Sequence, residues 1–381
     1  MGDTQLEPLA VYIHWPYCAR ICPYCDFNVY KRRDDAALLP AILKDLAHWR
    51  ELSGRREISS IHFGGGTPSL MTPAQVEAAI EQVDKLWGLE DIEIALEANP
   101  HEMNETDWRG YKVAGLTRLS LGVQSFNDAA LKLLGRDHDG ETARAALDLA
   151  MEIFPSVSAD LIFGWAGQTG VQLDADLGSL LLAGVPHLSV YQLTIEAGTA
   201  FAKAEDRGQS RAVSTDISAD FYDAVRGRLG AAGFKHYEVS NFAKPGHRSR
   251  HNLAYWRGTD YVGVGPGAHG RITSGGARTA TIAHLSPRAY SESVAQNQTG
   301  IDSRETLSRE DWAAEYLLMG LRIEEGISLA RYKELSGRGL NEVELDHLTR
   351  EGLLLRESDR LIASAQGRIV LNTVTEKLLL T

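Results

Sequence analysis

Cysteine is nearly absent from this 381-residue sequence: there are three cysteines, and all of them lie between positions 18 and 25. An odd number of thiols in so short a stretch makes a poor disulfide framework, because one thiol is left over and the loops are very short. We therefore expect no structural disulfide, and free thiols fit a reducing compartment. The scarcity points to a chemical role for these three residues.

The sequence also lacks long hydrophobic runs and an excess of basic residues. Its longest apolar candidates, such as Leu177–Val185, fall far short of the roughly 20 residues of a membrane span. The first ten residues have neither the basic start nor the apolar core of a signal sequence. With 39 basic and 51 acidic residues the formal net charge is −12, which argues against a broad nucleic-acid surface. Since 44% of the residues are hydrophobic, we predict a folded, cytoplasmic protein that binds no nucleic acid.

The cysteines that are present have a distinctive spacing. Cys18, Cys22 and Cys25 form a C-x3-C-x2-C motif. Three thiolates on one tight loop can hold an iron–sulfur cube and leave its fourth iron without a protein thiolate. An iron with an open position can bind and activate a small molecule. Two alternatives stay open, namely a zinc site with His14 as the fourth ligand and buried thiols without any metal.

Six short apolar segments predict β-strands, and amphipathic stretches between most of them predict helices. The strands are expected at Ala10–Trp15, Ser59–Phe63, Ile92–Glu97, Arg118–Val123, Val157–Phe163 and His187–Leu193, and the helices at Ala36–Glu51, Thr72–Trp87, Glu141–Ile153 and Gln172–Ala183. This alternation indicates a parallel sheet built from βαβ units. We predict an α/β fold with an open or incomplete (β/α)6-type barrel, the alternative being a small doubly wound sheet.

Unusual residues follow the ends of these strands. The cysteine loop follows the first strand, the run GGGTPS (Gly64–Ser69) follows the second, and Glu97 closes the third. Gln124 follows the fourth strand, Asp160 lies on the fifth, and Tyr191 and Gln192 lie on the sixth. Ligand sites in parallel α/β proteins gather at the carboxyl ends of the strands. We therefore expect these residues to converge on one site.

Each of these residues has a chemical role available. The glycine run permits close backbone approach to a ligand, unless it is a plain turn. Glu97 suits a ribose hydroxyl or an ammonium group, unless it is an ordinary exposed residue. Gln124 and Asp160 offer an amide and an acceptor. Arg136 offers a clamp for a carboxylate, the alternative being an ion pair with a neighbouring aspartate.

Together these motifs resemble a known family. The Cys18–Cys25 loop with its lead-in Tyr12–Pro16, the GGGTPS run, EANP, LGVQSF and Asp160–Gly164 look like the radical S-adenosylmethionine (SAM) superfamily, in the branch related to oxygen-independent coproporphyrinogen III oxidase. Phe27 stands where the oxidases have a further cysteine, and residues 251–256 form the segment HNLAYW, which the oxidases lack. An HNxxYW segment together with CPYCDF resembles the haem chaperones called HemW.

The resemblance implies a [4Fe–4S] cluster on Cys18, Cys22 and Cys25, with SAM at its open iron. The positions that match the superfamily's SAM contacts are Tyr12, Tyr24, Gly65, Gly66, Thr67, Glu97, Gln124, Arg136 and Asp160. In the superfamily the reduced cluster cleaves SAM to a radical, and the protein supplies orientation and exclusion of water. No side chain is therefore assigned a catalytic role.

The resemblance also implies haem as a third cofactor, with His251 as the candidate ligand. Its imidazole can bind iron, while Tyr255 and Trp256 offer flat apolar surfaces to a porphyrin. The positive charges able to meet propionates are Lys244, Arg248 and Arg250, and further candidate ligands are His247 and His269. The alternative is a packed aromatic turn with a hydrogen-bonded histidine. The glycine-rich stretch Gly263–His269 is expected beside the barrel mouth.

From about Ser303 the pattern changes to a helical appendage. Helices are expected at Trp312–Arg322, Ser328–Leu335 and Glu342–Glu351, a hairpin at Leu353–Glu357 and Arg360–Ser364, and a last helix at Gln366–Leu379. This order looks like a winged-helix domain, a fold that does not fix function. We predict a partial barrel in residues 1–200, a barrel extension in 201–302, and a winged-helix-like α+β domain in 303–381 that acts as a lid or interaction module.

The leading hypothesis is a haem chaperone of the radical SAM type. It would bind haem, a [4Fe–4S] cluster and SAM, and deliver haem to recipient haem proteins, with peripheral association at a membrane where respiratory enzymes assemble. The first rival is an oxygen-independent coproporphyrinogen III oxidase, which carries out a radical SAM oxidative decarboxylation. The second is a zinc-stabilised binding module.

Overall fold

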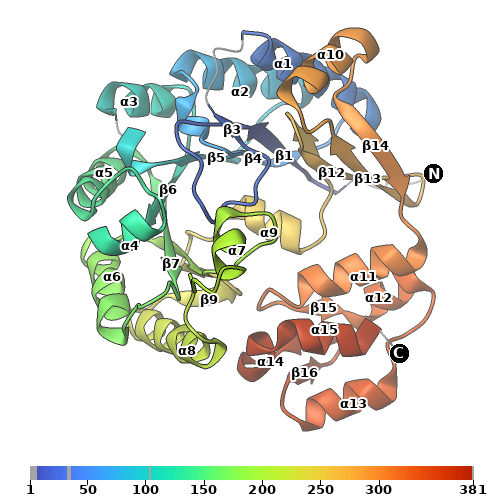
Figure 1. The fold of residues 1–381 in the computed structure, drawn as a ribbon. Helices are drawn as coiled ribbons and strands as arrows, with labels where there is room; N and C mark the ends of the chain where they lie inside the picture. Colours follow the sequence, from blue (N-terminus) through green and yellow to red (C-terminus); the bar gives the residue numbers. More distant parts are fainter. Residues whose placement is uncertain (1–6, 32–35, 103, 380–381) are drawn as a thin grey trace.

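The computed structural model describes residues 7–31, 36–102 and 104–379. Residues 1–6, which belong to the stretch without a signal-sequence pattern, lie outside this range. The described chain forms a 12-stranded sheet in the order β14-β13-β12-β11-β1-β4-β5-β6-β7-β8-β10-β9, followed by a C-terminal unit with a 3-stranded sheet (Figure 1).

Six parallel strands stand next to one another in chain order at the centre of the large sheet. They are β1 (Leu9–Trp15), β4 (Ile58–Gly65), β5 (Glu93–Ala98), β6 (Arg118–Gln124), β7 (Ser156–Phe163) and β8 (His187–Gln192). Each of the six predicted strands is confirmed to within two residues. A doubly wound sheet would reverse its strand order at a switch point, and this sheet does not reverse among these six strands. The doubly wound alternative is therefore wrong.

The barrel is incomplete because other strands occupy both of its edges. Parallel to β1 on its outer side runs β11 (Tyr261–Val264), and β10 (Asn241–Ala243) pairs antiparallel with β8. Beyond them the sheet continues through β12 (His269–Ser274), β13 (Ala277–Ala283) and β14 (Ile301–Thr306) on one side and β9 (Lys235–Glu238) on the other. Apart from the end of β14, these strands lie within residues 201–302, where a barrel extension was predicted without a structure being assigned to it.

Helices cover the outer face of the barrel (Figure 1). They are α1 (Leu38–Ser53), α2 (Pro73–Trp87), α3 (Glu105–Val113), α4 (Asp128–Leu133), α5 (Gly140–Ile153), α6 (Gly170–Leu182), α8 (Thr215–Ala231) and α10 (Pro287–Asn297). The four predicted helices are confirmed to within two residues at each end. Two of them begin with capping boxes, Thr72 with Gln75 and Thr169 with Gln172, which satisfy backbone amides at the helix start.

The strands alternate between an apolar outer face and a polar inner face, as a half-buried pleat requires. In β6, Leu119, Leu121 and Val123 are fully buried in the main hydrophobic cluster under the helices. Arg118 and Ser120, on the opposite side of this strand, point into the barrel, where they bond to side chains of β5 and β7. The barrel interior is therefore a polar space that can hold a hydrophilic ligand.

The C-terminal unit has its own hydrophobic cluster, formed by residues between Ala313 and Leu378. It consists of α11 (Arg309–Gly320), β15 (Ile327–Ser328), α12 (Leu329–Ser336), α13 (Glu342–Arg350), β16 (Leu354–Glu357), β17 (Arg360–Ala363), α14 (Ala365–Ile369) and α15 (Leu371–Leu379). The first three predicted helices and the hairpin are confirmed, and a short strand β15 adds to the hairpin.

One helix prediction in this unit is wrong. The single helix expected at Gln366–Leu379 is two helices, because the backbone leaves the helical region at Val370, with φ −114° and ψ 31°. The proposed domain limits stay a prediction. Strand β14 crosses the expected limit at residue 303, whereas the second hydrophobic cluster lies wholly beyond it.

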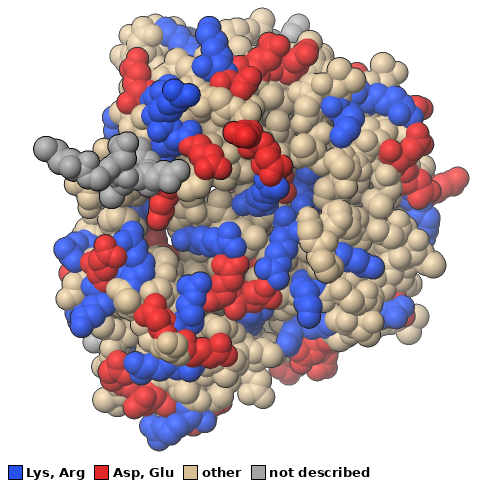
Figure 2. Space-filling model, turned by 180° about the vertical axis from the view of Figure 1, so that it is seen from behind, with Lys and Arg blue, Asp and Glu red and all other residues tan. Residues whose placement is uncertain are grey.

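Charged side chains of both signs are interspersed on the face seen in Figure 2. Arginine–carboxylate pairs, such as Arg271 with Glu315 at 2.7 Å, join the sheet extension to α11. Among the described residues, no helix has the length and apolar character needed to cross a membrane.

Candidate cofactor site at the barrel mouth

The cysteine loop lies at the carboxyl end of β1 and is closed at its base. Tyr17–Cys18 (β2) pairs in parallel with Tyr30–Lys31 (β3), so the chain returns to its starting point after the third cysteine. Between these strands the backbone amide of Cys25 donates to the carbonyl of Cys22 at 3.2 Å, which forms a tight turn. The loop is therefore a compact projection over the strand ends.

The glycine run of β4 supports this loop through its backbone. The amide of Gly66 donates to the carbonyl of Trp15, and the amide of Thr67 donates to that of Tyr17, both at 2.8 Å. A Cβ atom at position 66 would lie 2.7–2.8 Å from backbone atoms of Trp15, Pro16 and Tyr17. Only glycine allows this approach. The run is thus a close-contact element, and the plain-turn alternative does not account for it.

His14 fastens the far side of the cysteine loop. Its Nε2 donates to the carbonyl of Asn28 at 3.0 Å, and its Nδ1 accepts from the Tyr12 hydroxyl at 3.1 Å. Asn28 in turn donates to the carbonyls of Pro266 and Leu285 at 2.9 Å. The glycine-rich stretch Gly263–His269 therefore does lie beside the mouth, as predicted, and it braces the cysteine loop.

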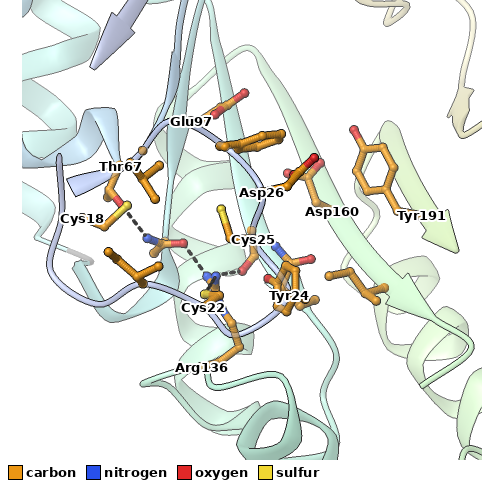
Figure 3. Close-up of a pocket in the computed structure, with 18 of the residues that line it drawn as sticks. Cys18, Cys22, Tyr24, Cys25, Asp26, Thr67, Glu97, Arg136, Asp160 and Tyr191 are labelled. Carbon is orange, nitrogen blue, oxygen red and sulfur yellow. Dashed lines mark hydrogen bonds between the residues drawn. The ribbon is translucent and has the colours of Figure 1, made fainter. Parts of the chain in front are cut away.

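A pocket of about 380 Å³ opens between this loop and the ends of β4 to β8 (Figure 3). Its size falls within the range of about 300–1,000 Å³ that is usual for small-molecule sites. The predicted site residues that line it are Cys18, Cys22, Tyr24, Cys25, Gly65, Gly66, Thr67, Glu97, Gln124, Arg136 and Asp160. Tyr12 lies just below, in contact with His14, and His251 lies elsewhere. The structure thus brings together eleven of the thirteen predicted positions.

Arg136 is held at the cysteine side of the pocket by three partners. Its Nη1 donates to Cys22 Sγ at 3.3 Å, and its Nη2 donates to Asn99 Oδ1 and to the carbonyl of Gly122. Asn99 also donates to Thr67 Oγ1 at 3.1 Å, so one amide connects the glycine run to the guanidinium. The alternative of an ion pair with a neighbouring aspartate is not what the structure shows. The arginine instead places a fixed positive charge beside the thiols.

Two carboxyl groups face the pocket from the strand ends. Glu97, whose side chain is 38% exposed, accepts from the Gly65 amide at 3.3 Å and from His62 Nε2 at 3.0 Å. Burial, together with the nearby charge of Glu97, raises the pKa of Asp160 to about 7. Ser120 lies at hydrogen-bond distance from Asp160 Oδ1, 3.4 Å away. Asp160 is therefore a carboxyl group that can carry a proton near neutral pH.

Gln124 marks a strained end of β6. It has a φ of 65°, in the left-handed region that side chains other than glycine rarely adopt, and the register with β7 shifts between Leu121 and Gln124. Strained backbone of this kind clusters at binding sites, where the surrounding fold enforces it. Here it places the residue on the pocket wall.

The three thiols border one pocket, and His14 is not free to join them as a metal ligand. All three cysteines border one pocket, yet among the described residues no three His, Cys, Asp or Glu side chains gather as ligands of one metal ion. His14, the proposed fourth zinc ligand, uses both ring nitrogens within the protein. Burial raises the pKa of Cys18 to about 11 and also raises that of Cys25. Coordination would deprotonate these thiols outright.

His251 lies at the opposite end of the barrel, on α9 (Arg250–Trp256). Glu93 at the start of β5 accepts from the backbone amide of His251 and from Ser249 Oγ, both at 3.2 Å. Arg118 at the start of β6 donates to Glu93 and to the carbonyls of His247 and Arg248. The segment therefore plugs the amino ends of the strands, and the structure does not bring it to the cysteine pocket.

The residues expected to surround a haem at this segment have protein partners. The Arg322 guanidinium lies 4.6 Å from the centroid of the Trp256 ring, and Tyr255, which is exposed, packs against Trp256 and Tyr261. Arg248 pairs with Glu324. Burial, followed by the charge of His62, lowers the pKa of His251 well below its ordinary value. A neutral imidazole is the form that binds iron, and the lowered pKa favours this form. The haem-ligand role of His251 stays a prediction.

Tyr191 at the end of β8 lines the pocket wall opposite the cysteines, as its place at a strand end predicted (Figure 3). Sequence analysis did not predict the roles of Asn99 and His62, which bond to Arg136 and Glu97. The position of Asn99 in the EANP run was an available signal. His62 carried none, because it lies in mid-strand.

A partial barrel with a C-x3-C-x2-C loop over its mouth defines the radical SAM class of protein, and comparison with known proteins agrees. Residues 12–178 match the model of the radical SAM superfamily, and residues 307–370 match that of the HemN C-terminal domain. The chain is 38% identical to radical S-adenosyl methionine domain-containing protein 1, mitochondrial, of Bos taurus, with 97% of this chain and 87% of that protein covered. It is 36% identical to heme chaperone HemW of Mycobacterium tuberculosis, with 98% and 95% covered.

Two further comparisons come from Escherichia coli. The heme chaperone HemW of this organism is 33% identical, with 98% of both chains covered. The structure of coproporphyrinogen III oxidase (HemN) superposes with a TM-score of 0.83 over 99% of this chain and 91% of that chain, at 23% identity, which shows a shared fold. This chain belongs to the radical SAM superfamily and, within it, to the family of the HemW proteins.

Proposed function

We propose that this protein is a cytoplasmic haem chaperone that holds a [4Fe–4S] cluster and SAM and delivers haem to recipient haem proteins. The observation that carries the proposal is similarity to HemW over nearly the whole of both chains. Phe27 supports it: this side chain lines the pocket and is 63% exposed, at the position where the oxidases have a cysteine.

Different residues of the pocket would hold the cluster and SAM. Cys18, Cys22 and Cys25 would ligate three irons, and Arg136 would offset part of the negative charge of the thiolates. Glu97 would accept from a hydroxyl or ammonium group of SAM, while Asp160 would act as donor or acceptor according to its protonation. When bound, the cluster and SAM supply one-electron chemistry at the open iron.

Haem transfer and porphyrinogen turnover separate the chaperone from the oxidase. Protein reconstituted with iron and sulfide without oxygen should bind haem, measured by absorbance, and pass it to an apo haem protein. It should form no protoporphyrinogen from coproporphyrinogen and SAM under reducing conditions. Protoporphyrinogen formation, or the absence of any haem transfer, would refute the proposal. Flotation with anionic vesicles during the transfer tests the peripheral membrane association.

The zinc-stabilised module makes a different prediction. Metal and sulfide analysis of protein purified without oxygen should find iron and acid-labile sulfide in excess of zinc. One zinc per chain without sulfide would favour the module instead.

A further inference from the structure

A line of side chains crosses the barrel interior from α9 to the cofactor pocket. The ring of His251 stacks on that of His62, with centroids 4.7 Å apart and an angle of 18° between the planes. His62 Nε2 donates to Glu97 Oε1 at 3.0 Å, and Glu97 Oε2 accepts from the Gly65 amide. The carboxylate at the mouth is thus connected to the plug at the amino ends through a single imidazole.

The only side-chain hydrogen bond of His62 in the described part of the protein joins its Nε2 to Glu97. Its side chain is 13% exposed, and its Nδ1 is buried with no hydrogen-bond partner in the described part of the protein. A buried nitrogen without a partner is costly, so such an atom in a native structure needs an explanation. Stacking also holds the His62 ring in place: the Tyr12 ring lies parallel to it, with centroids 6.1 Å apart and 18° between the planes.

The other end of the line is fixed by polar contacts. Ser60 Oγ lies 3.0 Å from His251 Nδ1, and Glu93 accepts from the His251 amide. Glu93 forms a buried ion pair with Arg118 at 2.8 Å, and both side chains are less than a tenth exposed. The position of α9 therefore determines where the His251 ring lies, and this ring limits how His62 can turn.

We propose that His62 is a positioning residue through which α9 sets the orientation of Glu97, and thereby the affinity of the pocket for SAM. The inference rests on the proposed function in one respect only, which is that Glu97 contacts SAM. If His251 also ligates haem, its ring would have to leave His62. Haem and SAM would then influence each other's binding by the same factor in both directions.

Calorimetric titration of the reconstituted protein with SAM tests the positioning role, with cluster absorbance recorded for every variant. His62→Phe keeps a stacking ring and loses the donor to Glu97, and we expect it to weaken SAM binding about tenfold, the typical loss for a hydrogen bond to a charged group. His62→Gln keeps a donor and should stay within about threefold of the parent. In a Glu97→Gln background, His62→Phe should have no further effect.

The connection to α9 is tested by a second pair of variants. His251→Ala removes the stack and should weaken SAM binding about threefold or more, while His251→Phe restores a ring and should return most of the affinity. The matched control is His236→Phe. His236 is likewise a half-buried histidine stacked on an aromatic ring, Phe242 at 4.4 Å and 12°, but its Nε2 bonds to the carbonyl of Val239 far from the pocket. This control should bind SAM as the parent does.

The outcomes separate this inference from the proposed function. Parent affinity in both His62→Phe and His251→Ala, with loss in Glu97→Gln, overturns the positioning role and leaves the SAM site intact. Parent affinity in Glu97→Gln as well overturns both the positioning role and the Glu97 contact. Neither result bears on whether haem is bound and transferred, since that is measured without SAM.

Discussion

Replacing Asp160 with asparagine should stabilise the cofactor-free protein at alkaline pH and reduce the dependence of its stability on pH. Burial is the main reason why the pKa of this carboxyl rises from its ordinary value of 3.8 to about 7, and the charge of Glu97 is the second. Because the raised pKa makes the folded state bind the proton more tightly than the unfolded state, stability is lost as pH rises from 3.8 to about 7.

The magnitude follows from the difference between the two pKa values. Each pH unit in this window is worth about 1.4 kcal/mol, so the full penalty is about 4 kcal/mol. Between about pH 5.5 and about pH 8.5, about 2 kcal/mol of it should be visible. Asparagine has the same shape as protonated aspartate and cannot ionise. The variant should therefore be more stable than the parent by about 2–4 kcal/mol at about pH 8.5, with a smaller difference in acid.

Urea unfolding followed by tryptophan fluorescence, under reducing conditions at both pH values, measures this difference. Asp206→Asn, at an exposed position after the short helix α7 (Ala200–Glu205), is the matched control and should leave the pH dependence unchanged. Glu97→Gln should reduce the dependence in part, because it removes the second cause of the raised pKa. Parallel pH profiles for the parent and Asp160→Asn would refute the reasoning, because they would mean that the carboxyl ionises as easily in the folded protein as in the unfolded one.

Three further predictions concern the supports of the site. Cys22→Ser should abolish the broad visible absorbance of the reconstituted cluster; an unchanged spectrum would show that this thiol does not ligate iron. Gly66→Ala places a methyl group 2.7 Å from the Tyr17 carbonyl oxygen and should cost about 1–3 kcal/mol in urea unfolding and lower cluster content, whereas Gly170→Ala, where a Cβ meets nothing within 4 Å, should do neither. Glu93→Gln leaves the buried Arg118 without its counter-charge and should cost about 3 kcal/mol; equal unfolding midpoints would show that the pair adds no stability.

The parts of the fold that could be predicted are those whose residues show a local periodicity or a helix cap. The alternation of β6 and the capping residues of α2 and α6 indicated strands and helices wherever periodicity was strong. Three strands of the sheet extension could not be placed in the same way, since β10 has three residues and β9 and β11 have four each, too few for a period to show. Strands β12, β13 and β14 are longer, with six or seven residues, and were not predicted either.

Within the site, the sequence indicated what each residue can bind, but not always where that residue lies in the folded protein. The spacing of the cysteines and the strand-end rule placed Glu97 and Asp160 correctly. Asn99 meets Arg136 across 37 positions of sequence, a contact that no local pattern records. For His251 the motif indicated a ligand, whereas the tertiary fold places it at the amino ends of the strands.

The bracing of the cysteine loop by Asn28 has a consequence for how the protein is made. The Asn28 side chain donates hydrogen bonds to the carbonyls of Pro266 and Leu285, and the Tyr30 hydroxyl also donates to the carbonyl of Leu285. A nascent chain that has not yet been translated past Leu285 lacks the partners that give this loop its shape. The loop can therefore reach its final shape only after Leu285 has been translated, so a cluster that requires this shape would be loaded late in biosynthesis.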